Sequence, residues 1–264
     1  MRANFNKVYL SLWILLSVAF CAFVAFSFSD NPSIMGLKKA SFKETLLAHS
    51  ENMEDNIPMV QDTVRAIEQE KPLPQLDSVP KNIFLFGDSM TLNIALRMAK
   101  YAAQNGHQFH AVNWDSSNTK LWADTDTLRY YLNKFKPDYV FICLGSNEVY
   151  FKNPNVRAPY VKQILQEIGD RQYVWIGPPN WNKDTGINDM LEKLCGNGHF
   201  FRSEGIELER KADKIHPTKD ASAFWVDSLM RWMGKASHPI LSDIPSDTLR
   251  HVKSNIRIIK AWNN

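Results

Sequence analysis

From about residue 81 onward, the chain alternates short apolar runs with segments whose apolar residues recur at helical spacing. The apolar runs predict strands at 82–87, 108–115, 138–145, 172–179 and 199–203, and the helical periods predict helices at 90–105, 125–135, 159–169, 186–196 and 219–234. Strands that are apolar on both faces and alternate with helices indicate parallel βαβ units with helices on both sides of a sheet. The pattern therefore predicts an α/β domain over residues 81–234, in which a ligand binds beyond the carboxyl ends of the strands.

A longer apolar run lies near the N-terminus. Residues 8–28 are 21 uncharged residues, close to the ~20 that cross a bilayer as a helix. Signal-peptide cores are usually ~7–15 residues long, and only Ala25-Phe26-Ser27 resembles a cleavage site. We expect residues 1–29 to be an uncleaved membrane anchor, with a cleavable signal peptide as the alternative. Because Arg2 and Lys7 precede the run, the rest of the chain is expected on the periplasmic or extracellular side.

Two further segments flank the predicted domain. Residues 30–80 are polar and rich in proline near both ends of one amphipathic stretch, so we expect a stalk with a short helix at about 59–70. Residues 235–264 form a tail, in which the pattern predicts a short, basic amphipathic helix at about 248–260. Packing of that helix on its own domain is the default expectation, and a membrane surface or a partner protein is the alternative.

Composition narrows the class of protein. The chain has 264 residues and a formal net charge of +3, from 31 basic and 28 acidic residues that are dispersed rather than grouped. This distribution gives no indication of a nucleic-acid partner. The three cysteines suggest neither a disulfide framework nor a zinc site. Cys143 lies in a strand-like run, and Cys195 lies at a predicted helix end where we expect it to be exposed.

Polar residues follow the predicted strands, and all of them are expected at one rim of the sheet. They are Gly87-Asp88-Ser89, Asp115-Ser116-Ser117-Asn118, Gly145-Ser146-Asn147-Glu148 and Pro178-Pro179-Asn180-Trp181, joined by Asp213 and His216 from the loop before the last helix. A serine hydroxyl needs a base to become a nucleophile, and a histidine oriented by a carboxylate is the usual base at neutral pH. An oxyanion also needs fixed donors, for which the Ser89 N–H, a backbone N–H of the 116–117 turn and the Asn147 amide are candidates.

Each of these residues has a simpler interpretation when it is considered alone. Ser89 is well placed to cap the following helix, Asn147 is a common turn residue, and Asp213 and His216 are compatible with a solvated loop. The order in which they occur along the chain favours a shared site.

The segments "FGDSM", Ser-Ser-Asn-Thr at 116–119, "LGSNE" and "DKIHP" resemble the ordered blocks of the SGNH, or GDSL-like, hydrolases. The resemblance covers about residues 81–234. It implies a flavodoxin-like three-layer α/β/α sandwich with a central parallel sheet and no metal or other cofactor. It also implies Ser89 as nucleophile, His216 as base and Asp213 as its orienter, with an oxyanion hole made by the Ser89 N–H, the Ser117 N–H and the Asn147 amide.

Two positions depart from the family pattern. Ser117 stands where the second block usually has glycine, and Glu148 stands where the third block usually has aspartate. Further candidates for substrate contact are Asp88, Ser116, Glu148 and Trp181. Trp114 and Trp122 are expected either to stack on a sugar ring or to pack in the interior.

The combined expectation is a membrane-anchored, exported serine esterase or acyltransferase. Its substrates would be small O-acyl esters, above all acetyl esters, of cell-envelope glycans. The alternative is a non-catalytic, membrane-tethered protein with a degenerate SGNH fold that binds glycans or acts as a scaffold. The sequence leaves the oligomeric state and the choice between hydrolysis and transfer open.

Overall fold

The computed structural model describes residues 33–34, 37–38, 74–246, 249, 252 and 255–260. The chain divides into two compact units, Met1–Lys71 and Pro72–Asn264. In the first unit, β1 (Ser33–Ile34) and β2 (Leu37–Lys38) pair antiparallel. The anchor expected at 1–29 and the helix expected at 59–70 lie outside the described residues. Within the described ranges, no helix is long and apolar enough to cross a membrane.

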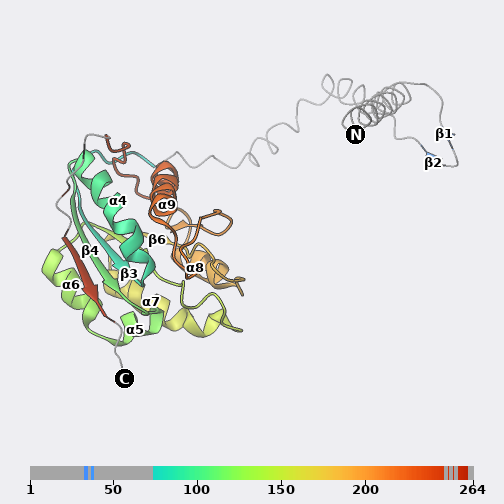
Figure 1. Ribbon diagram of the computed structural model, residues 1–264, viewed down its shortest axis with the longest axis horizontal. Coiled ribbons are helices and arrows are strands. Elements are labelled where there is room, and N and C mark those ends of the chain that lie inside the picture. Colours follow the sequence, from blue (N-terminus) through green and yellow to red (C-terminus); the bar gives the residue numbers. More distant parts are fainter. Residues whose placement is uncertain are drawn as a thin grey trace, which may run out of the picture. The chain divides into compact units, whose positions relative to one another are not determined.

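A six-stranded, all-parallel sheet forms the centre of the second unit (Figure 1). Its spatial order is β7-β6-β5-β3-β4-β8. The strands are β3 (Asn82–Gly87), β4 (Gln108–Trp114), β5 (Tyr139–Cys143), β6 (Gln172–Ile176), β7 (Phe200–Phe201) and β8 (Asn255–Ile259). The first five confirm the strands predicted from the apolar runs, although the structure ends four of them earlier than predicted.

Helices cover both faces of this sheet. One face carries α4 (Met90–Gln104) and α9 (Lys219–Trp232), and the other carries α5 (Thr119–Asp124), α6 (Thr127–Phe135), α7 (Ala158–Ile168) and α8 (Ile187–Cys195). Short 3-10 turns occur at η2 (Pro154–Arg157) and η3 (Met233–Lys235). Alternate residues of β3 supply the two cores: Leu85 packs under α4 and α9, and Phe86 packs under the helices of the other face. The predicted α/β class is confirmed.

The C-terminal tail differs from its expectation. Instead of the helix predicted at about 248–260, Asn255–Ile259 is strand β8, which pairs in parallel with β4 at the edge of the sheet. Its three isoleucines favour a strand because β-branched side chains fit a pleated surface, and the pairing covers the polar backbone edge of β4. The periodicity over this basic segment is equally compatible with a helix, and only the open edge of β4 decides between the two.

Two other local expectations are also wrong. The sequence pattern assigns residues 74–80 to the stalk, but Asp77 pairs with Ile240 and its N–H donates to the Pro239 carbonyl at 2.9 Å. Cys195 was expected to be exposed, but it is only 6% exposed because the end of α8 packs into the core. The position of a residue at a helix end does not reveal whether its side chain packs against the core or faces solvent.

The junction between β3 and α4 determines where a ligand can bind. The chain passes from β3 to β4 on one side and later to β5 on the other, so β3 lies at the topological switch point of the sheet, where open α/β sheets bind ligands. The last residue of β3 must be glycine, because a Cβ on Gly87 would lie 1.9 Å from the Cys143 carbonyl oxygen. Ser89 follows two residues after this close approach of β3 and β5, at the switch point.

Candidate active site

Ser89, His216 and Asp213 form a continuous hydrogen-bonded relay. Ser89 Oγ lies 2.9 Å from His216 Nε2, and His216 Nδ1 lies 2.8 Å from Asp213 Oδ2. Ser89 comes from the start of α4, whereas the other two come from the loop that precedes α9. The structure therefore brings together the three residues that the sequence suggested as nucleophile, base and orienter.

The loop that carries Asp213 and His216 holds the carboxylate in its ionised form. Asp213 Oδ1 accepts the backbone N–H groups of Ile215 and His216, each at 2.9 Å. The hydrogen bond from the His216 ring, together with these two backbone donors, holds the pKa of Asp213 well below its usual value. An ionised Asp213 accepts a hydrogen bond from the Nδ1–H group, which assigns the Nδ1–H tautomer and leaves Nε2 as an acceptor facing the Ser89 hydroxyl.

Ser89 is not used as a helix cap. Its side chain makes no capping hydrogen bond, and the Asp88 carboxylate accepts the Met90 N–H at 3.0 Å instead. Asp88 is completely buried, and burial raises its pKa to about 7 against the opposing effect of the Met90 N–H. Asp88 thus satisfies the start of α4, and the Ser89 hydroxyl remains available to His216.

Two groups can donate to an oxyanion beside Ser89. Within the part of the chain that the structure describes, the Ser89 N–H has no hydrogen-bond acceptor, and it lies at the positive end of α4. Asn147 follows β5 and donates one side-chain N–H to the Ser117 carbonyl at 2.8 Å. A carboxamide has a second N–H, so Asn147 can be oriented by one hydrogen and donate the other to a ligand.

The Ser117 N–H, which was expected to complete the oxyanion hole, is already used in a hydrogen bond within the protein. That N–H donates to the Trp114 carbonyl at 3.1 Å, and the residue is completely buried. Its Oγ accepts the indole N–H of Trp122 at 2.9 Å. Ser117 therefore closes a turn, satisfies a buried indole and orients Asn147 through its carbonyl, while the exposed neighbour Ser116, at φ +60°, lines the cavity.

The predicted substrate contacts of Glu148, Asp88 and Trp181 are not supported, because none of the three lines the cavity beside Ser89. Glu148 is completely buried; it accepts the Thr119 hydroxyl at 2.6 Å and pairs with Arg157 at 3.0 Å. Burial raises the pKa of Glu148, and the Thr119 hydrogen bonds oppose that rise. The Trp181 indole N–H donates to the Ser146 carbonyl at 2.8 Å. These side chains hold the loops that carry Asn147 and Ser116.

Trp114 and Trp122 pack in the interior. They are 4% and 1% exposed, and the Trp122 ring packs against Phe86 with 4.7 Å between ring centroids. Of the two alternatives left open by the sequence, interior packing is therefore correct for both tryptophans.

An open cavity of about 590 Å³ adjoins the relay. Its lining combines the two relay residues Ser89 and His216 with Leu92, Asn93, Asp115, Ser116, Lys211 and Lys260. Sequence reasoning missed both lysines as site residues. Lys211 lies two residues before Asp213, and this proximity in the sequence points to the site. Lys260 follows β8, a segment whose pattern predicts a helix, so the sequence alone does not place it at the cavity.

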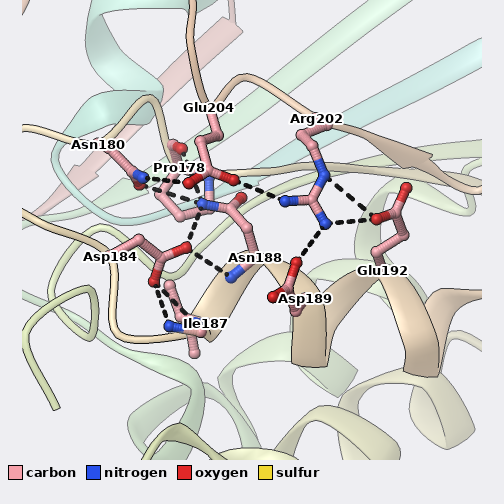
Figure 2. Close-up of polar contacts among 10 residues, drawn as sticks. Pro178, Asn180, Asp184, Ile187, Asn188, Asp189, Glu192, Arg202 and Glu204 are labelled. Atoms are coloured by element: carbon pink, nitrogen blue, oxygen red, sulfur yellow. Dashed lines mark hydrogen bonds and ion pairs between the residues drawn. The ribbon is translucent and has the colours of Figure 1, made fainter. Parts of the chain in front are cut away.

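A second polar network fixes the neighbouring loop after β6 (Figure 2). Arg202 contacts Asp189, Glu192 and Glu204, and the Asn188 amide donates to Asn180 and Asp184. The Asp184 carboxylate also accepts the N–H groups of residues 186–188 and thereby caps α8. In the described residues, no group of three or more His, Cys, Asp or Glu side chains is arranged to hold a metal ion.

Comparison of the chain with protein-family models, with curated proteins and with solved structures finds no match. Arguments about function therefore depend on the geometry of the relay and the cavity.

Proposed function

We propose that this protein is a serine esterase or O-acyltransferase of the SGNH type, acting through a Ser89-His216-Asp213 triad. The observation that carries the proposal is the 2.9 Å approach of His216 Nε2 to Ser89 Oγ, backed by the 2.8 Å contact with Asp213. A flavodoxin-like description of the domain is supported by the strand order. Counted in chain order from β3, the sheet reads 6-2-1-3-4-5, which is the flavodoxin order with one strand added outside strand 2.

In the first half of the proposed reaction, Ser89 Oγ attacks the carbonyl carbon of an ester while its proton passes to His216 Nε2. The ionised Asp213 stabilises the imidazolium that results. Negative charge on the carbonyl oxygen is met by the Ser89 N–H and the free N–H of the Asn147 amide, and each such donor typically contributes ~2.7–4 kcal/mol. The tetrahedral intermediate then expels the alcohol, which takes the proton from His216 and leaves an acyl group on Ser89.

In the second half, water or the hydroxyl group of an acceptor attacks the acyl-enzyme. His216 removes the proton of the attacking group and returns it to Ser89 Oγ when the acyl group leaves. Hydrolysis and transfer differ only in which nucleophile enters the cavity, so the same residues serve both.

The proposed substrates are small O-acyl esters, especially acetyl esters, of cell-envelope glycans. An open cavity lined mostly by polar side chains supports a hydrated, polar substrate over a long acyl chain. The uncharged run at residues 8–28, preceded by Arg2 and Lys7, supports a membrane-anchored enzyme whose catalytic domain faces the envelope.

A non-catalytic glycan-binding or scaffolding protein is the second candidate. The engagement of the Ser117 N–H by the Trp114 carbonyl favours it, because the family pattern expects a donor at that position. The intact relay argues against a non-catalytic protein. A protein that only binds glycans does not need a histidine base aligned with a serine hydroxyl and oriented by an ionised aspartate.

The decisive assay is release of 4-nitrophenol from 4-nitrophenyl acetate by the full-length chain, compared with its Ser89→Ala variant. Turnover that disappears in the variant supports an active esterase, and equal rates for the two proteins would overturn it. Adding acetyl-acceptor glycans to the same assay separates transfer, which forms acetylated sugar, from hydrolysis, which forms only acetate.

A further inference from the structure

The cavity beside Ser89 carries an excess of positive charge. Its charged lining consists of Lys211, Lys260 and Asp115, apart from the relay histidine. Two ammonium groups therefore face one carboxylate in the space where the ester and its alcohol must lie.

Lys211 is positioned by the same loop as the catalytic base. Its backbone N–H donates to the His216 carbonyl at 2.8 Å, so the location of Lys211 is tied to that of His216. Its ammonium group contacts the neutral side-chain oxygen of Asn93 at 2.9 Å. A lysine has three N–H donors, and an amide does not neutralise its charge. Lys211 can therefore offer both charge and hydrogen bonds to a ligand.

Lys260 reaches the cavity from a different element and follows directly after β8. The β8 pairing places it there, because the Ile259 carbonyl accepts the Asp115 N–H at 2.9 Å. The Lys260 ammonium group lies 3.2 Å from Asp115 Oδ2, while Asp115 Oδ1 accepts the Asn113 amide at 2.6 Å. The carboxylate is thus already engaged by protein groups, and the positive charge of Lys211 is left without an acidic partner among the cavity residues.

We propose that this cavity recognises an anionic group, a carboxylate or a phosphate, on the alcohol side of the ester. The inference deepens the proposed function and depends on it: the substrates would be O-acyl esters of acidic glycans. Lysine ammonium groups are point-charge ligands for both anions, and a cleft of one sign of charge also raises the local concentration of an oppositely charged substrate.

The test compares two esters that differ in one charge, 4-nitrophenyl acetate and 3-carboxy-4-nitrophenyl acetate, with the full-length chain. We expect a higher kcat/KM for the charged ester, and a fall of about two- to fivefold in that preference for Lys211→Gln, as for a solvent-exposed ion pair. A Lys211→Gln/Lys260→Gln double variant should lose more. Raising the salt concentration from about 0.05 to about 0.5 M shortens the screening length, which is ~10 Å at 0.1 M. This change should lower the rate with the charged ester and leave the rate with the neutral ester unchanged.

Lys162→Gln is the matched control, because it removes one positive charge from the exposed surface of α7, outside the cavity. It should leave the preference unchanged. Competition at constant ionic strength by galacturonate oligomers and by glycerol phosphate distinguishes a carboxylate from a phosphate as the preferred anion.

The outcomes separate the two claims. If the neutral ester is hydrolysed but the charged ester is not preferred, or the lysine variants leave the preference unchanged, anion recognition is wrong while the esterase stands. If neither ester is hydrolysed by the wild-type chain, the proposed function is overturned, and the inference that depends on it is overturned with it.

Discussion

His216 Nε2 lies 2.9 Å from Ser89 Oγ although the two residues are separated by 127 positions in the chain. Ser89 is fixed by the turn from β3 into α4, and His216 by the Asp213 carboxylate and the backbone of its own loop. Because each partner is held by a different part of the domain, their alignment is a property of the complete fold. Changes that leave the fold intact but alter one partner can therefore isolate the chemistry.

Asp213→Asn should lower kcat for 4-nitrophenyl acetate by about 10³- to 10⁴-fold with little effect on the melting temperature. The asparagine oxygen can still accept the Ile215 and His216 N–H groups, but its NH₂ would face His216 Nδ1. The ring would then carry its proton on Nε2 and could not accept one from Ser89. A loss of less than tenfold would show that Asp213 does not set the tautomer.

Asn147→Ala should lower kcat by about 10²- to 10³-fold and leave KM nearly unchanged, because an oxyanion donor acts mainly in the transition state. Asn155→Ala is the matched control, since it removes an exposed carboxamide from η2. Steady-state kinetics of the two variants provide the comparison. A rise in KM at constant kcat would instead assign Asn147 to ground-state binding.

Glu148→Gln should destabilise the domain through the buried pair with Arg157. Removing one partner of such a pair typically costs about 3–5 kcal/mol, and the Thr119 contacts, which glutamine can still accept, should reduce the loss toward the lower limit. Urea unfolding measures the change. Glu148→Ala, which also leaves Thr119 without its acceptor, should be less stable than Glu148→Gln, and equal stabilities would contradict the role of the Thr119 contact.

Stability should fall as the pH rises from about 4 to about 7, in part because of Asp88. Its pKa is about 7 in the folded chain and 3.8 as the reference value, so between these values the folded state binds more protons at this site than the unfolded state. The slope from one such group is at most about 1.4 kcal/mol per pH unit. Urea unfolding of Asp88→Asn at several pH values should show a shallower fall, and an unchanged slope would mean that Asp88 is ionised across this range.

Much of the fold follows from residue patterns because apolar runs and helical periods alternate clearly over most of residues 81–234. The helix at 119–124 was not predicted, since six residues give too little periodicity and its cap depends on Asn118. The strand at 255–259 was not predicted either, because an edge strand is decided by its partner. Because this strand is not predicted, Lys260, which follows it, is not predicted as a cavity residue either.

The relay could be predicted because each of its residues lies next to a recognisable strand end or in a short Asp-x-x-His spacing. The supporting roles of Glu148 and Ser117 could not be predicted from the sequence. Glu148 and Ser117 occupy positions where the family pattern suggests chemistry, but both are completely buried and hold the loops. Burial of a polar side chain within a loop depends on neighbours such as Arg157 and Trp122, which lie elsewhere in the chain.

The most direct test of the central claim is labelling of the full-length chain with a fluorophosphonate probe, followed by identification of the modified peptide by mass spectrometry. Such probes react with a serine that has been activated by a base. The proposed triad predicts stoichiometric labelling at Ser89 that is lost in Ser89→Ala and strongly slowed in His216→Gln. Absence of labelling at Ser89 in the folded wild-type chain would contradict it.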